Sequence, residues 1–186
     1  MSDFQERMLS GRMNDISNSP GEIEGKVSAQ YAGDQAKVYA ARTRLQNALD
    51  QADALDAIRE IAVNLIGTQE VAVFKIDKKS SELWLHWSFG ADPNKHSVLE
   101  VCREPRLKEV LSGKPVFRSK LSNENLLSTD VPVNALVPIL VDGSPAAVIV
   151  LFRLFPHKTG IEPVDREICE VLSNCAGRAV GPYRAR

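Results

Sequence analysis

The sequence has few cysteines, few aromatic residues and almost no net charge. Its three cysteines among 186 residues show no C-x-x-C spacing, which excludes a disulfide scaffold or zinc knuckle and favours a reducing compartment. A formal net charge of -1 gives no basic field to attract nucleic acid or anionic lipid. No apolar run approaches the roughly eighteen residues of a membrane span, and residues 1–15 lack the apolar centre of a signal peptide. We expect a cytoplasmic protein with no membrane insertion and no nucleic-acid partner.

Signatures of catalysis are also missing. The sequence contains no glycine-rich phosphate loop, GxSxG elbow or HExxH pair. His86, His96, His157 and Cys102 do not stand at metal-ligand spacings, so we expect no metal and no cofactor. The sequence therefore predicts a protein that is not an enzyme.

Three segments at the two ends of the chain have distinct characters. Residues 1–33 are rich in serine, glycine and charge, which favours a flexible arm, with a short partner-docking helix around Phe4, Met8 and Leu9 as the alternative. Residues 34–66 contain no proline or glycine and end before Gly67, which predicts one long helix. Residues 162–181 predict a second amphipathic helix, which closes a domain over 34–182.

The segments between these helices predict strands. Residues 70–77 and 82–89 read as a hairpin, and a short helix before Gly113 leads to a strand around 115–118. In the second strand, alternation places Leu83, Leu85, Trp87 and Phe89 on one face.

A second hairpin, over 135–141 and 146–154, is apolar on both faces and turns at Asp-Gly. A ribbon of this kind belongs in the centre of a sheet that is covered on both sides. We therefore predict an α+β fold: a mainly antiparallel sheet of five or six strands, with the two long helices on one face and loops and short helices, residues 90–131, over the other.

Four phrases in this order resemble a GAF domain, a ligand-binding and dimerising fold of signalling proteins. They are "LDQADALDAIREIAVNLIGTQEVAVFKID", "REPRLKEVLSGKPVF", "NALVPILVDGSPAAVIVLFR" and "IEPVDREICEVLSNCAGRAV", and the resemblance spans residues 45–181. It implies a GAF-like sheet with a ligand pocket between the sheet and the loops.

The chemistries known in GAF proteins find little support here. The Asn-Lys-x-Asp motif of cyclic-nucleotide binders is lacking, since Asn94-Lys95 is followed by His96-Ser97. Cys102 is followed by Arg103-Glu104 rather than by the histidine often found beside a bilin-binding cysteine. A free methionine sulfoxide reductase needs several pocket cysteines, whereas Cys169 and Cys175 lie on the predicted exit helix.

The resemblance directs attention to two sets of residues. Pocket-lining candidates are Trp87, Phe89, Cys102, Arg103 and Phe117, with plain core or solvated surface as the alternative. A 34–66 helix would be about 48 Å long and would extend beyond a body roughly 35 Å across, so a second copy should cover its apolar stripe. Candidates for this dimer interface are Val38, Leu45, Ala48, Ala52, Ile168 and Cys175.

These observations favour a stand-alone, non-enzymatic GAF-like regulatory protein. We expect a homodimer that senses a small ligand or relays a signal to a protein partner, since no output segment is evident in the chain. A ligand-free scaffold that uses its helices and N-terminal arm is the alternative, and a sulfoxide reductase-like enzyme is a third.

Overall fold

The computed structural model describes residues 20–77, 79–80, 82–95, 97–119 and 124–181. The chain divides into two units, residues 1–33 and 34–186, and helix α1 (Pro20–Gln46) runs through the boundary. The further described elements are α2 (Gln51–Glu60), the π-helix η1 (Ile61–Ile66), β1 (Val71–Asp77), β2 (Glu82–Phe89), β3 (Val98–Glu100), α3 (Pro105–Val110), β4 (Val116–Phe117), β5 (Ala135–Val141), β6 (Ser144–Leu151), α4 (Pro163–Cys175) and the 3-10 helix η2 (Ala176–Val180). Phe4, Met8 and Leu9 lie outside the described residues.

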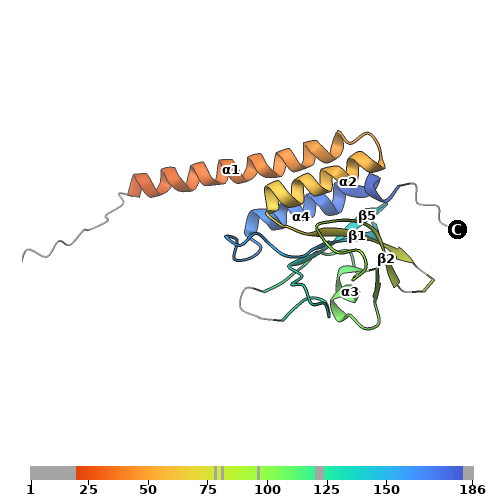
Figure 1. The fold of residues 1–186 in the computed structure, drawn as a ribbon. Helices are drawn as coiled ribbons and strands as arrows, with labels where there is room; N and C mark the ends of the chain where they lie inside the picture. The colour runs from red at the N-terminus through yellow and green to blue at the C-terminus, as the bar shows by residue number, and fades with distance from the viewer. Residues whose placement is uncertain (1–19, 78, 81, 96, 120–123, 182–186) are drawn as a thin grey trace, which may run out of the picture. The chain divides into compact units, whose positions relative to one another are not determined.

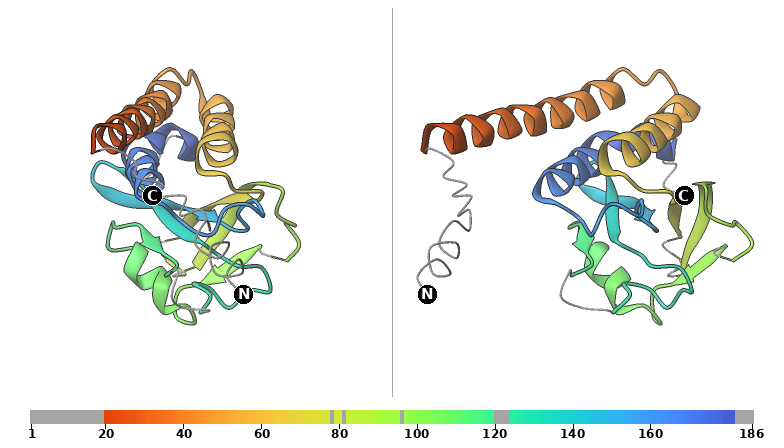
Figure 2. Two further views of the ribbon diagram at one scale, coloured as in Figure 1. Left: turned by 90° about the vertical axis from the view of Figure 1, so that its left-hand side faces the viewer. Right: turned by 60° about the vertical axis from the view of Figure 1, so that its left-hand side comes forward.

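The strands form one antiparallel sheet in the order β3-β2-β1-β6-β5-β4, with six strands among the described residues. Helices α2 and α4 cover one face of this sheet, and α3 with the neighbouring loops covers the other (Figure 1). We call these the helix side and the loop side. The views in Figure 2 show the same two layers on the sheet, so the predicted α+β fold is confirmed.

The hairpin that is apolar on both faces lies in the middle of the sheet. Its turn places Asp142 at φ 52° and Gly143 at φ 74°, the left-handed geometry that a two-residue hairpin favours. Val137 and Ile149 pack on the helix side, while Leu136 and Val150 pack on the loop side. Each strand of the hairpin therefore contributes to two cores.

The prediction of one helix over 34–66 is wrong. Helix α1 begins at Pro20, inside the predicted arm, because proline suits a first helical turn. It ends at Gln46, and α2 begins after Asp50, whose side chain accepts the Asp53 N–H at 2.9 Å. Asp53 in turn accepts the Leu49 N–H at 2.9 Å, so each aspartate satisfies a backbone donor where α2 begins.

The other end of this helical segment agrees with the prediction. Gly67 follows η1 in the left-handed conformation, with φ 83°, and its N–H bonds to the carbonyl oxygen of Ala62. The break after Gln46 nevertheless removes the uninterrupted 34–66 helix on which the length argument for a dimer was based.

A β-bulge changes the face on which part of β2 packs. Val73 lies opposite Trp87, but its neighbour Phe74 lies opposite Leu85, so His86 is an extra residue in β2. Leu83 and Leu85 consequently contact the loop-side core, whereas Trp87 contacts the helix-side core. The prediction that Trp87 and Phe89 share a face with Leu83 and Leu85 is therefore wrong.

Candidate functional site

The five pocket candidates do not line one pocket. Trp87 and Phe117 are partly buried against the helix-side core, and Phe89, 40% exposed, lies at the end of β2 with the Arg59 guanidinium 5.5 Å from its ring centroid. Cys102 and Arg103 are exposed in the turn after β3. The bulge in β2 explains why Trp87 and Phe89 do not face the loops.

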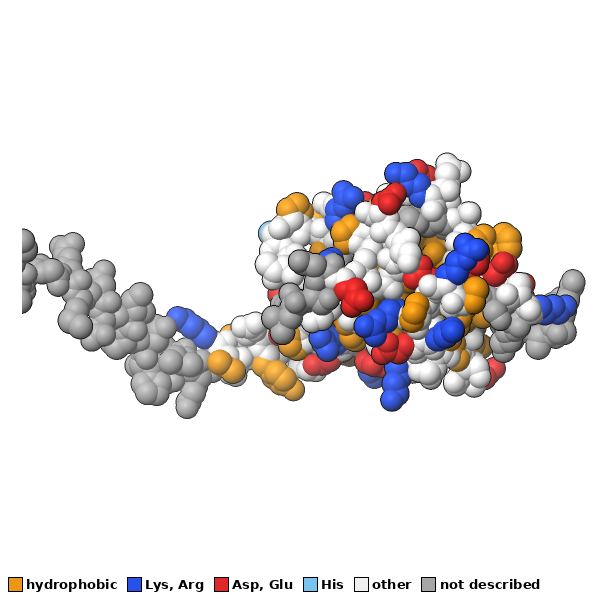
Figure 3. Space-filling model, turned by 90° about the horizontal axis from the view of Figure 1, so that it is seen from below, with side chains coloured by type: hydrophobic (Ala, Val, Ile, Leu, Met, Phe, Trp, Pro, Cys, Tyr) orange, Lys and Arg blue, Asp and Glu red, His pale blue; other side chains and the backbone are white. Residues whose placement is uncertain are grey.

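Apolar side chains fill the space between the sheet and the described residues of α3 and its neighbouring loops. The loop-side core consists of Ala72, Phe74, Leu83, Leu99, Leu107, Val110, Val116, Leu126, Leu127, Val133, Leu136, Val148, Val150 and Phe152, all less than 10% exposed. The outer surface on this side intersperses acidic and basic side chains with small apolar spots among the described residues (Figure 3). The region where the resemblance implies a pocket is thus packed as core.

The three cysteines lie in separate environments. Cys102 is exposed, with its Sγ 3.8 Å from Glu100 Oε2, and Arg103 Nε pairs with the same oxygen at 2.8 Å. Cys169 is fully buried in α4, and burial raises the pKa of its thiol. Cys175 lies at the end of the same helix and is partly buried. Among the described residues, then, no second thiol lies on the loop side with Cys102.

Most dimer-interface candidates belong to the domain's own core. Leu45 is 2% exposed, and Ala48 and Ile168 are fully buried, so these side chains have no surface to offer a second copy. Val38 and Cys175 are partly buried against the same core. The remaining candidate, Ala52, is exposed on α2. For Leu45, Ala48 and Ile168, the predicted contact with a second copy is therefore replaced by packing inside the domain, while Ala52 stays a prediction.

Helix α1 has three large apolar side chains that are exposed and were not among the predicted interface residues. Val27, Tyr31 and Tyr39 are 63%, 67% and 72% exposed. Val27 and Tyr31 continue, at helical spacings of four and three, the stripe that ends in the buried Ala41 and Leu45. In residues 34–46 this face of α1 is buried at Ala41 and Leu45, and in residues 20–33 it carries the exposed Val27 and Tyr31.

His86 of β2 forms a polar link with the start of α2 and with η2. The amide nitrogen of Gln51 lies 2.8 Å from His86 Nε2 and donates to the Ala179 carbonyl oxygen at 3.0 Å. Burial, followed by the nearby Lys75 ammonium, lowers the pKa of His86. The neutral ring accepts at Nε2, and this joins β2 to the start of α2 and to η2.

Among the described residues, no group of three histidine, cysteine or acidic side chains could hold a metal ion. No helix in the described part of the chain is long and apolar enough to cross a membrane.

Two open clefts, each of about 470 Å³, lie on the domain surface. The first, which we call the β4 cleft, is lined by Arg106, Glu109, Pro115, Val116, Phe117, Arg118, Ser119, Glu124, Asn125, Leu126 and Arg166. The second, the β3 cleft, is lined by Lys95, Val98, Leu99, Glu100, Arg103, Glu104, Ser128, Thr129 and Asp130. Phe117 and Arg103, two of the predicted pocket residues, thus line different clefts.

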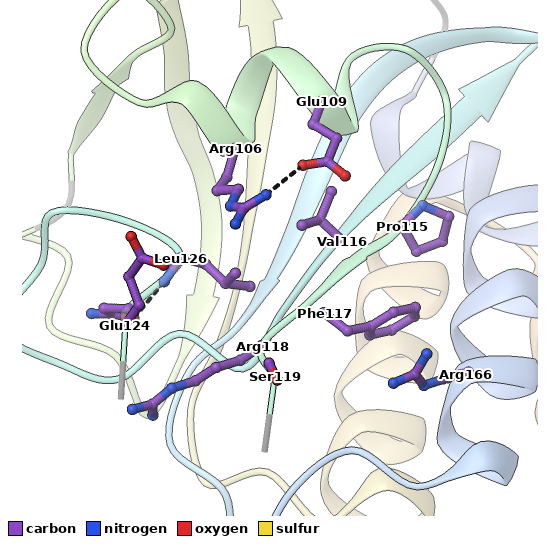
Figure 4. A pocket seen from close by; sticks show the side chains of 11 residues that line it. Arg106, Glu109, Pro115, Val116, Phe117, Arg118, Ser119, Glu124, Leu126 and Arg166 are labelled. Atoms are coloured by element: carbon purple, nitrogen blue, oxygen red, sulfur yellow. Dashed lines mark hydrogen bonds and ion pairs between the residues drawn. The ribbon is translucent and has the colours of Figure 1, made fainter. Parts of the chain in front are cut away.

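The β4 cleft brings arginines together from separate elements. Arg106 comes from α3, Arg118 follows β4, and Arg166 lies in the first turn of α4; in Figure 4, Val116 and Phe117 lie between Arg106 and Arg166. Arg166 is not among the residues that the sequence singles out, since an arginine on the polar side of a helix is usually solvated. The local sequence of α4 gives no signal that this turn packs beside β4.

Comparison with solved structures agrees with this architecture. The chain resembles the GAF domain of an Acinetobacter phosphoenolpyruvate-protein phosphotransferase at TM-score 0.59 and 13% identity, covering 79% of this chain and 92% of that one. It also resembles the nlh2 GAF domain of A. aeolicus, at TM-score 0.57 and 16% identity, covering 77% of this chain and 93% of that one. A free methionine-R-sulfoxide reductase from Neisseria meningitidis matches at TM-score 0.59 and 14% identity, covering 81% and 92%.

These similarities define the class of fold. The chain has a GAF-like fold, as its four sequence phrases predict. No protein-family model matches the chain, and no curated protein does either. At these identities the structural likeness fixes the fold and leaves the function to the site.

Proposed function

We propose that this protein is a non-enzymatic regulatory protein of signal transduction, which acts in the cytoplasm as a homodimer and relays its state to a protein partner. The observation on which the proposal depends is the stripe of α1. Ala41 and Leu45 fix one end of this stripe in the domain core, whereas Val27 and Tyr31 expose the other end. A helix of this kind links the domain to another surface, and a second α1 offers the same stripe.

The arrangement of thiols supports a non-enzymatic role. Reduction of a sulfoxide requires one thiol to attack and a second to resolve the intermediate. Cys102 and the buried Cys169 lie on opposite sides of the sheet, and a fully buried thiol with a raised pKa is a poor nucleophile. We therefore expect no cysteine-dependent reduction of free methionine sulfoxide, and wild type and Cys102→Ser should give the same background rate.

Regulation in such a protein requires two arrangements of the paired helices. A ligand or partner that binds one arrangement more tightly shifts the population toward it. The alternative, a scaffold without a ligand, is favoured by the filled loop-side core. A ligand-sensing regulator would bind a small molecule at a site other than the loop-side core, whereas a scaffold would bind none.

Sedimentation of the purified chain tests the dimer. We expect a dimer at about 10 µM, and a monomer when Val27 and Tyr31 are both changed to Asp, because two charges would lie in the paired stripe. Tyr39→Asp is the matched control: Tyr39 is 72% exposed on α1 but lies roughly 120° around the helix from Val27. A wild-type monomer, or equal dissociation by Tyr39→Asp, would reject the pairing.

A further inference from the structure

The β4 cleft has more basic than acidic residues among those that line it. Three arginines from separate elements face two glutamates, Glu109 and Glu124. The β3 cleft, of the same volume, has the opposite balance, with Lys95 and Arg103 against three acidic residues. The β4 cleft is therefore the better place for a negatively charged group.

Arg166 is positioned by an aromatic ring rather than by a carboxylate. Its guanidinium carbon lies 4.9 Å from the centroid of the Phe117 ring. Among the described residues, no acidic side chain lies within ion-pair distance of it. Stacking on a ring restricts the plane of the guanidinium and leaves its N–H donors free at the edge, the arrangement that binds an oxyanion through two parallel hydrogen bonds.

Arg106 retains donors for the same purpose. Its Nη1 pairs with Glu109 Oε2 at 3.0 Å, and both side chains are about half exposed, at 49% and 53%. An exposed pair three residues apart on a helix is weak, and a guanidinium has five N–H donors. A single contact with Glu109 therefore leaves Arg106 able to bind or attract an anion.

Four of the six uncharged lining residues are apolar, and the other two are Ser119 and Asn125. Val116 and Leu126 are 5% and 6% exposed, and Pro115 and Phe117 lie beside them. A wall of this kind suits a carbon skeleton, and about 470 Å³ lies in the usual range of small-molecule sites.

From this geometry we infer that the β4 cleft binds a small organic anion, with an apolar body against Val116 and Leu126 and a carboxylate or phosphate held by Arg166. Because β4 is an edge strand of the sheet and Arg166 belongs to α4, the ligand would connect the loop side with the helix layer. This inference rests on the regulatory function proposed above, for which it names the class of ligand.

Three small molecules serve as probes of the β4 cleft. Benzoate and benzamide share a ring and a planar head group and differ by one negative charge. Inorganic phosphate presents the oxyanion without a ring. Titration followed by NMR should move the resonances of Arg166 and Phe117 with benzoate and leave them in place with benzamide. A stronger response to benzoate than to phosphate identifies a carboxylate ligand, and the reverse identifies a phosphate ligand.

Variants assign the binding to the cleft. Arg166→Gln should weaken benzoate binding at least about tenfold, since a charge-assisted hydrogen bond is lost. Arg166→Lys should weaken it less, because lysine keeps the charge but not the stacked, paired donors. Arg42→Gln, an exposed arginine of α1 outside the cleft lining, should bind like wild type. Arg106→Gln serves as the second cleft variant if Arg166→Gln unfolds.

Three results would each overturn the inference: equal binding of benzamide, unchanged affinity in Arg166→Gln and Arg106→Gln, or no response to benzoate or phosphate up to about 10 mM. Sedimentation of the same samples separates this failure from failure of the proposed function. A dimer without anion binding rejects only the ligand class, and anion binding by a monomer rejects only the dimer.

Discussion

Arg44 Nε donates to Glu60 Oε2 at 2.7 Å, which ties the last turn of α1 to the last turn of α2. The same guanidinium donates through Nη2 to Asp53 at 2.8 Å and lies 3.8 Å from Asp56. These acidic partners raise the pKa of Arg44, with the Glu60 hydrogen bond as the largest cause. One cation thus closes the helical hairpin formed by α1 and α2.

Arg44→Gln should lower the free energy of unfolding by about 1 kcal/mol, because a partly exposed network contributes little more than that. Urea denaturation of wild type and variant measures this loss, at low and at high salt concentration. Lys37→Gln is the control, since Lys37 pairs with Asp34 inside α1 and does not bridge two helices. An equal loss in both variants would show that the bridge between the helices adds nothing.

Acid should weaken the same bridge. The Leu49 N–H, and next Arg44, lower the pKa of Asp53, so its contribution is complete above the ordinary aspartate pKa of about 3.9. It is lost as pH falls through the lower folded value, because the unfolded chain is protonated first. The difference in stability between wild type and Asp53→Asn should therefore shrink below about pH 4. A constant difference down to pH 2 would contradict this.

His86 should give the domain a second, milder pH dependence. Because the folded pKa of His86 is lowered, the unfolded chain binds the proton first as pH falls below about 6.5, and stability decreases. Protonation also places a donor at Nε2 against the Gln51 amide nitrogen. In His86→Gln, the midpoint temperature of thermal unfolding should therefore fall less between pH 7 and pH 5 than it does in wild type. The exposed His157, which is stacked on Phe155, is the control. His157→Gln should show the same fall in the midpoint temperature as wild type.

The ion pair between Lys158 and Asp165 is the most buried of the described pairs. Its atoms are 2.7 Å apart, and the side chains are 12% and 1% exposed. Asp165→Asn leaves a mostly buried ammonium without its counter-charge and should cost about 3 kcal/mol. In the exposed pair of Lys37 and Asp34, the change Asp34→Asn should cost less than about 0.5 kcal/mol. Similar costs measured by denaturation would refute the difference.

Thiol labelling tests the separate environments of the cysteines. In native protein, Cys102 should react fast with an aromatic disulfide reagent, Cys175 more slowly, and Cys169 only after unfolding, since it is fully buried with a raised pKa. Mass spectrometry of the labelled peptides identifies each site. Rapid native labelling of Cys169 would mean that α4 opens readily.

Much of the fold could be predicted from sequence because its strongest patterns are local. The hairpin of β5 and β6 is apolar at every position on both faces, and only a central, covered place satisfies that. The break after Gln46 was missed because alanine and leucine continue through it, although the Asp50 and Asp53 pair was a visible capping signal. The bulge at His86 has no such signal, because the extra residue is defined by pairing with β1.

The candidate site was less predictable for a related reason. The β4 cleft combines α3 and β4, which are neighbours in the sequence, with the first turn of α4, which is distant from both. Phe117 was singled out as an aromatic residue in a predicted strand, but its contact with Arg166 depends on how the helix layer meets the sheet edge. Composition and spacing contain no information about that contact.

The bulge in β2 also determines which codon of this strand the gene can lose. Deleting the codon of His86 removes the one unpaired residue and keeps the pairing with β1 on both sides of it, so the other side chains of β2 stay on their faces of the sheet. Deleting the codon of Trp84 instead brings Leu83 next to Leu85, and strict alternation then turns one of these two leucines away from the loop-side core. An in-frame loss of three nucleotides is therefore more harmful at Trp84 than at His86.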